Sequence, residues 1–128
     1  IIDATSAACE ALEYILRQDG FRISALVKGR ERALAEIRLN QPDIICAELI
    51  DLDKSEMSLL AALHRDFPTI PVVVISNNAD RHAVQHAIGL GAVGFVLMPF
   101  AAAEVQTTFH RVRTLLAQRA AKLLPTAS

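Results

Sequence analysis

The sequence predicts a doubly wound α/β domain, in which helices cover both faces of a five-stranded parallel sheet. Five short runs rich in Val and Ile alternate with five amphipathic stretches, and this order is typical of parallel strands joined by helical crossovers. The runs are almost continuously apolar, as expected of strands buried on both faces. The chain has 128 residues, of which 52% are hydrophobic, so we expect one core.

Each expected element has a place along the chain. The predicted strands lie at residues 1–2, 21–27, 44–47, 72–75 and 95–97. The first strand has only two apolar residues before Asp3, fewer than an ordinary strand needs, so we expect its start to be missing from this chain. The predicted helices lie near residues 6–19, 30–39, 55–66, 79–90 and 101–124. Glycines follow two of these helices and prolines follow two others, as helix terminators do.

Composition excludes several classes of function. Lys and Arg number 13 and Asp and Glu number 14, for a net charge of −1, which argues against direct nucleic-acid or membrane-surface binding by this domain. No apolar run approaches the roughly 18 residues that span a bilayer, and we find no signal peptide. Cys9 and Cys46 are far apart in the sequence, and we interpret them as buried, reduced thiols of a cytoplasmic protein.

Five segments together carry a resemblance to a known family. They are residues 1–3 (IID), 18–21 (QDGF), 42–45 (PDII), 70–76 (IPVVVIS) and 91–100 (GAVGFVLMPF). In this combination and order the chain resembles the receiver domain of two-component response regulators, over about residues 1–118. The resemblance implies a flavodoxin-like (CheY-like) fold, with residues 119–128 as a C-terminal helix extension or linker tail.

The family's chemistry is phosphoryl transfer from a histidine kinase onto an aspartate at the end of the third strand, helped by Mg²⁺. The resemblance places a pocket of five positions at the strand ends of this sequence: Asp3, Ala4, Glu48, Ser76 and Met98. Asp3 and Ser76 match the family. Ala4 replaces a second acidic residue, Glu48 replaces the acceptor aspartate, and Met98 replaces the lysine that grips the phosphoryl group.

These departures predict a degenerate pocket with no catalytic residue and weak or absent Mg²⁺ binding, because phosphoryl transfer depends on positioning and on fixed positive charge. We therefore expect a non-enzymatic pseudo-receiver that acts by protein–protein contact without phosphorylation. Two alternatives stay open. One is a receiver that a histidine kinase still phosphorylates, on Glu48 or on Asp51 or Asp53 nearby, and the other is a small-molecule sensor that uses the vacated pocket.

The resemblance also implies a switch and a contact surface. Phe95 stands at the family's aromatic switch position with Ser76 as its partner, and packing against the last two helices is the simpler interpretation of Phe95. We expect a cis peptide bond before Pro99. The surface candidates are Val84, Ile88, Phe95 and Arg111, and the expected partner is an output domain, a histidine kinase or a second copy of the chain. Glu48 itself has two interpretations, a mimic of the phosphorylated state or a polar residue left at a solvent-filled strand end.

Overall fold

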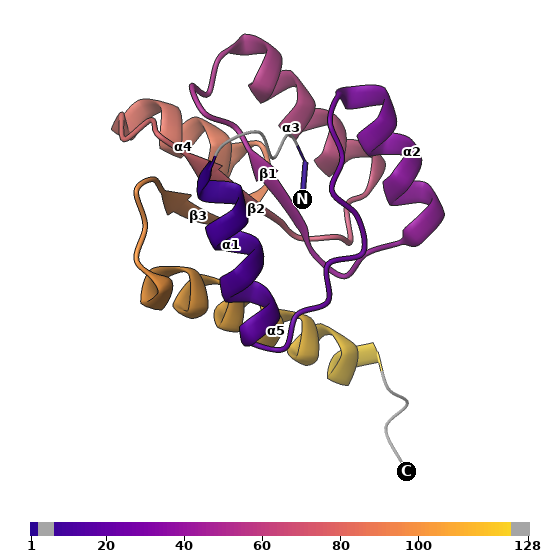
Figure 1. Ribbon diagram of the computed structural model, residues 1–128. Coiled ribbons are helices and arrows are strands. Elements are labelled where there is room, and N and C mark those ends of the chain that lie inside the picture. Colours follow the sequence, from indigo (N-terminus) through magenta and orange to yellow (C-terminus); the bar gives the residue numbers. More distant parts are fainter. Residues whose placement is uncertain (3–6, 124–128) are drawn as a thin grey trace.

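Three parallel strands form the centre of the sheet, in the computed structural model of residues 1–2 and 7–123 (Figure 1). The strands are β1 (Ile45–Glu48), β2 (Val72–Ser76) and β3 (Ala92–Leu97), in the order β1-β2-β3. Every residue of β1 and β2 is buried. Continuous burial explains why these segments are apolar at successive positions, since both faces of the sheet are covered.

The sheet continues beyond β1 through two isolated bridges. Ile2 pairs in parallel with both Val27 and Ala47, so the order across the sheet runs from the segment of Val27 through Ile2 to β1, β2 and β3. The strand order reverses on either side of Ile2. A doubly wound sheet places its site outside the carboxyl ends of the strands at such a reversal.

The predicted fold class is confirmed, and the predicted number of full strands is not. The expected strands at residues 1–2 and 21–27 form single bridges at Ile2 and Val27 rather than ladders. A ladder needs a row of backbone hydrogen-bond partners on the neighbouring strand. Among residues 1–2 and 7–123, the backbone pairing of this segment is with Ile1 and Ile2.

In the part of the chain that the structure describes, five helices cover the two faces of the sheet: α1 (Ala7–Gln18), α2 (Arg30–Asn40), α3 (Lys54–Asp66), α4 (Arg81–Gly89) and α5 (Ala102–Leu123). One core cluster joins the sheet to α2, α3 and α4, and its fully buried members include Ala33, Leu60 and Ala87. A second cluster joins the opposite face to α1 and α5 through Leu12, Phe109 and Val112. The predicted helices are thus confirmed within about two residues at each end that is described.

Local sequence signals start and stop these helices. Asp80 accepts a hydrogen bond from the backbone of Ala83 and caps the start of α4, as a short acidic side chain does at an N-cap. Gly91 follows α4 at φ 115°, and a Cβ there would lie 2.5 Å from the His64 ring. Glycine is required at this turn both by the backbone angle and by the approach of α3. Both cysteines are free and buried, as predicted.

Candidate functional site

The carboxyl ends of the three strands lie along one edge of the sheet. β1 ends at Glu48, which pairs with Ile75, and β2 ends at Ser76, which pairs with Leu97. Met98 follows directly, and its backbone N–H donates to the carbonyl of Ser76 at 2.8 Å. The structure therefore brings Glu48, Ser76 and Met98 to one edge. Asp3 and Ala4, the other two predicted pocket positions, lie outside the described residues.

Glu48 is a buried carboxylate. The residue as a whole is 4% exposed, and the backbone N–H of Glu48 donates to the carbonyl of Ile2 at 3.1 Å. Within residues 1–2 and 7–123, its Oε1 atom has no hydrogen-bond partner. Burial raises the pKa of the Cys9 thiol, and the Glu48 carboxylate raises it further.

The position of the family's lysine is apolar. Met98 is half-buried, and its side chain packs against the core cluster beneath α1 and α5. The described Lys, Arg and His side chains form three ion pairs, and Glu48 takes part in none of them. Among the described residues Glu48 therefore has no ion-pair partner, and Met98 supplies no positive charge where the family has its lysine.

Ser76 joins two loops. Ser76 is fully buried. Its hydroxyl donates to the carbonyl of Ile50 at 2.8 Å, and the hydroxyl oxygen accepts from the backbone N–H of Asn78 at 3.1 Å. The backbone N–H of Asn77 donates to the same carbonyl of Ile50 at 3.1 Å. The hydroxyl therefore holds the loop after β1 to the loop after β2.

Asn78 and Asp80 extend this connection between the two loops. We call the whole set the brace: Ser76, Asn78 and Asp80, with the backbone of Ile50 and Asp51. The Asn78 amide donates to the carbonyl of Asp51 at 3.0 Å, and its oxygen accepts from the backbone of Asp80 at 2.8 Å. Asp80 in turn caps α4. Sequence reasoning missed Asn78 and Asp80, although their Asx-type spacing before a helix is a recognisable signal.

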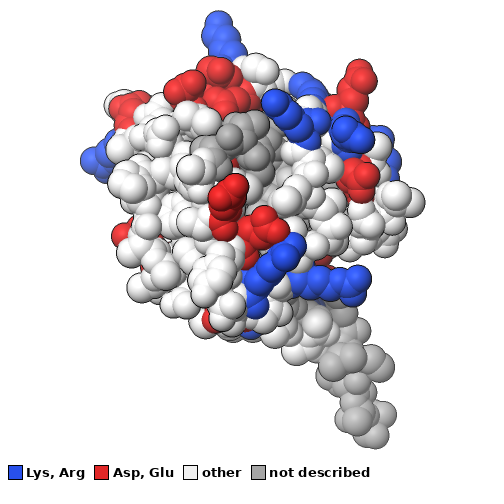
Figure 2. All heavy atoms as spheres, viewed as in Figure 1, with Lys and Arg blue, Asp and Glu red and all other residues white. Residues whose placement is uncertain are grey.

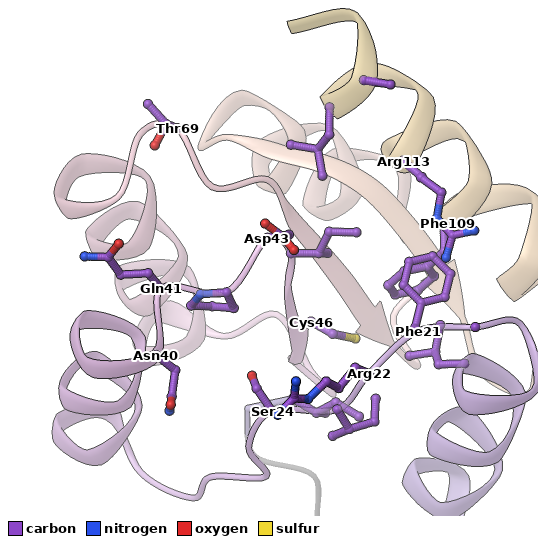
Figure 3. Close-up of a pocket in the computed structure, with 18 of the residues that line it drawn as sticks. Phe21, Arg22, Ser24, Asn40, Gln41, Asp43, Cys46, Thr69, Phe109 and Arg113 are labelled. Carbon is purple, nitrogen blue, oxygen red and sulfur yellow. The ribbon is translucent and has the colours of Figure 1, made fainter. Parts of the chain in front are cut away.

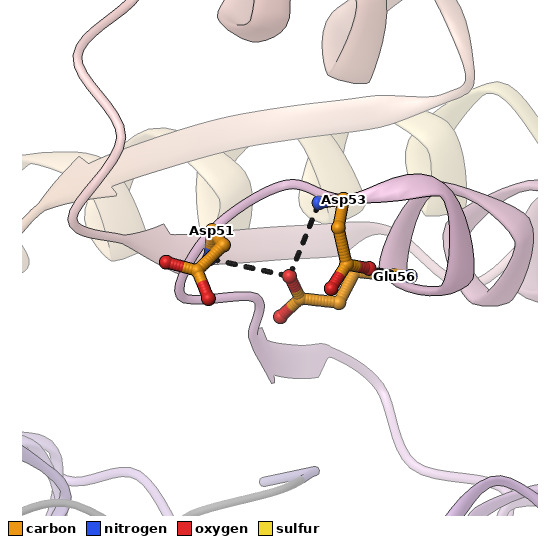
Figure 4. Close-up of side chains that lie close together, drawn as sticks. All are labelled: Asp51, Asp53 and Glu56. Carbon is orange, nitrogen blue, oxygen red and sulfur yellow. Dashed lines mark hydrogen bonds between the residues drawn. The ribbon is translucent and has the colours of Figure 1, made fainter.

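The alternative acceptors Asp51 and Asp53 belong to an exposed acidic group with Glu56 (Figure 4). Their ligand atoms lie within 4.8 Å of one another. Glu56 accepts from the backbone N–H groups of Asp51 and Asp53, and Asp53 accepts from that of Glu56. The last two bonds form the capping box at the start of α3, which accounts for the group structurally.

The described strand-end residues do not by themselves fit a Mg²⁺ site. Glu48 is the one carboxylate among Glu48, Ser76 and Leu97, whereas Mg²⁺ prefers several oxygen ligands in octahedral geometry. The carbonyl of Ile50 already accepts two hydrogen bonds.

The predicted switch and surface residues occupy varied environments. The Met98–Pro99 bond is cis, as expected. Phe95 is half-buried and packs against the cluster beneath α2, α3 and α4. Val84 is half-buried, Ile88 is 54% exposed, and Arg111 is exposed with a 3.5 Å hydrogen bond to the Val93 carbonyl.

Charges of both signs are interspersed over the face shown in Figure 2, with apolar and neutral side chains between them. This mixture agrees with the net charge of −1. None of the described helices is long and apolar enough to cross a bilayer.

The fold and the position of Glu48 define a doubly wound α/β domain with its site at the reversal of strand order. The family model of the response regulator receiver domain matches residues 1–110. The chain therefore belongs to the receiver domains of two-component response regulators. Receiver domains are signalling modules that interact with kinases and output domains.

Several regulators are similar to this chain. It is 33% identical over 91 residues to the transcriptional regulatory protein CseB of Streptomyces avermitilis, covering 71% of this chain and 38% of that protein. It is 25% identical over 114 residues to the DNA-binding transcriptional regulator NtrC of Proteus hauseri, covering 89% of this chain and 24% of that protein. The chain thus spans 24% and 38% of the length of these two relatives.

Solved receiver domains share the fold. The receiver domain of NtrX from Brucella abortus has a TM-score of 0.73 and 24% identity, covering 87% of this chain and 93% of that one. The REC domain of AraT, a response regulator from Geobacillus stearothermophilus, has a TM-score of 0.76 and 18% identity, covering 93% and 94%. At these identities the likeness supports the architecture alone.

Proposed function

We propose that this domain is a pseudo-receiver: a response regulator input module that works through protein contacts without being phosphorylated. The observation that carries the proposal is that the acceptor position holds a buried Glu48 and the lysine position holds an apolar Met98. Phosphoryl transfer is catalysed almost entirely by positioning and charge stabilisation. Both requirements are weakened here.

The position of the carboxylate supports the same conclusion. Glu48 is one methylene longer than the family's aspartate, and a displacement of about 1 Å can cost roughly a hundredfold in rate. The side chain is also buried, which limits access by a phosphodonor. Asp51 and Asp53 are exposed, but both lie in the loop beyond β1, and the Asp53 carboxylate caps α3.

The test is exposure of the purified protein to acetyl phosphate and Mg²⁺, followed by intact-mass measurement. We expect no added phosphoryl group. A stoichiometric gain of one group would overturn the proposal, and peptide mapping would then identify the acceptor.

A restored variant provides the matched positive control. The substitutions Ala4→Asp, Glu48→Asp and Met98→Lys return the two acidic positions and the cation to the family pattern. We expect this triple variant to gain one phosphoryl group under the same conditions. Circular dichroism of both proteins establishes that they are folded.

The contact surface proposed for the output partner is centred on α4 and β3. Ile88 of α4 and Leu97 at the end of β3 are exposed apolar residues, at 54% and 38%, and exposed apolar side chains favour protein contact. An Ile88→Glu variant is expected to retain stability within about 0.5 kcal/mol and to lose binding to an output domain or to a second copy, measured by analytical ultracentrifugation.

A further inference from the structure

Charge is divided unevenly along the chain. Residues 81–128 hold five of the 13 Lys and Arg and one of the 14 Asp and Glu, for a net charge of +4, whereas residues 1–80 carry −5. The one acidic residue of the positive part is Glu104, in the first turn of α5. An imbalance of this kind indicates a surface that selects its partners by charge.

Two of the basic side chains of α5 contact the turn after α1. The guanidinium of Arg113 lies over the ring of Phe21 at 3.9 Å and donates to the carbonyl of Asp19 at 3.5 Å. His110 forms an ion pair with the Asp19 carboxylate. Figure 3 shows Arg113 beside Phe21 and Phe109, whose rings meet edge to face at 5.6 Å. These contacts fix which side of α5 faces α1.

A different side of α5 carries an exposed stripe, which we define as Arg111, Leu115, Gln118 and Lys122. Steps of four, three and four residues place these side chains on one face of the helix. Leu115 is half-buried, and the other three are exposed. The helix rises about 16 Å from Arg111 to Lys122, so the stripe has a cation at each end and an apolar side chain between them.

The stripe borders a groove beside the start of β3. The groove has a volume of about 460 Å³, and its lining includes Val93, Arg111, Thr114, Leu115 and Gln118. Arg111 donates to the carbonyl of Val93 at 3.5 Å, and this bond uses one of the five N–H donors of a guanidinium. Ile88, at the end of α4 and shortly before β3, is 54% exposed. Apolar and cationic groups therefore alternate over this part of the surface.

We propose that the stripe and its groove bind an acidic, amphipathic segment of a partner protein. Carboxylates of this segment pair with Arg111 and Lys122, and an apolar side chain between the carboxylates packs on Leu115. Paired charges around an apolar contact give both steering and specificity. The inference rests on the proposed function, because it extends the contact surface of α4 and β3 to α5 and states the chemistry of the partner.

The same features argue against two other occupants. A two-fold contact places the same surface of two copies together, which would set the cations of one copy against those of the other and cost affinity. A nucleic acid would match the charges of Arg111 and Lys122. Its phosphates would, however, leave Leu115 and Ile88 without an apolar partner, whereas the centre of a protein interface is apolar. An acidic protein segment satisfies both kinds of group.

The test uses a designed acidic peptide, Asp-Glu-Leu-Ile-Asp-Glu-Leu-Leu-Asp-Glu, and a matched peptide in which Lys replaces every Asp and Glu. Binding to the isotope-labelled 128-residue chain is followed by NMR chemical shifts. We expect the acidic peptide to bind with a Kd below about 1 mM and to shift the amides of Val93, Leu115 and Gln118. No binding of this peptide, equal binding of the Lys peptide, or shifts confined to other surfaces would overturn the proposal.

Charge reversal separates this surface from the charge of the whole chain. We expect Arg111→Glu with Lys122→Glu to weaken binding of the acidic peptide at least about tenfold, because each change replaces attraction by repulsion. Lys28→Glu with Arg32→Glu is the matched control, since both residues are exposed, one before α2 and one within it. Its effect on the Kd should stay within about twofold, because distant exposed charges are screened. Equal effects of the two double variants would overturn the proposal.

Two further measurements test the choice of partner. Tighter binding of a short DNA duplex than of the acidic peptide, lost in the charge-reversed variant, would assign the surface to nucleic acid. A dimer of the chain alone that the same variant dissociates would assign it to a second copy. The proposed function fails separately, because a phosphoryl group gained from acetyl phosphate would overturn it whether or not the peptide binds.

Discussion

Replacing Ser76 by alanine removes the centre of the brace that joins the loops after β1 and β2. The Ser76 hydroxyl makes two hydrogen bonds at 2.8 and 3.1 Å, to the Ile50 carbonyl and from the Asn78 N–H. A neutral hydrogen bond contributes about 1 kcal/mol net, so the free energy of unfolding is expected to fall by about 2 kcal/mol. The Ile50 carbonyl keeps its bond from Asn77, and this second bond limits the loss.

The assay is urea denaturation followed by circular dichroism, with the slope compared between variants to establish that the unfolded surface is unchanged. Ser55→Ala is the matched control, because Ser55 is an exposed residue of α3; we expect a change within about 0.5 kcal/mol. A loss below about 0.5 kcal/mol for Ser76→Ala would refute the brace.

The brace also predicts non-additivity. Asn78 binds the Asp51 carbonyl and the Asp80 N–H, so Ser76 and Asn78 support one another in a single network. In a double-mutant cycle, we expect a coupling energy of about 0.5–1 kcal/mol between Ser76→Ala and Asn78→Ala. Additive effects would mean that the two residues act independently.

Three further predictions concern Glu48, the cap of α3 and the thiols. Glu48→Gln removes a buried charge at constant size and is expected to raise the free energy of unfolding at pH 7 by about 1–2 kcal/mol, measured in urea; a comparable loss would reveal a cationic partner. Asp53→Ala removes the capping box and should cost about 1 kcal/mol in the same assay, whereas an unchanged midpoint would count against the cap. Burial raises the pKa of Cys46 from 9.0 to about 12, so the unfolded chain releases this proton first and stability should fall between pH 9 and 12. Cys46→Ala should flatten that part of the pH profile, and an unchanged slope would contradict the assignment.

The amino-acid sequence alone determined the order of helices and strands and the place of the site. Continuous apolar runs such as 72–75 predict strands because burial on both faces leaves no polar position. Carboxyl-terminal strand ends predict the site because parallel strands bring those ends to one edge. Glu48, Ser76 and Met98 could therefore be placed together without coordinates, and the structure confirms their common edge.

Only the tertiary structure decided which segments pair as strands and which hydrogen-bond partners the buried polar groups have. Residues 21–27 have the pattern of a strand. Whether they form a ladder depends on the backbone that lies opposite them in the fold, where Val27 pairs with Ile2. The hydroxyl of Ser76 meets a carbonyl 26 residues away, and Glu48 is buried without a described cation. Local pattern reports which residues prefer burial, whereas hydrogen-bond satisfaction depends on groups brought together only by folding.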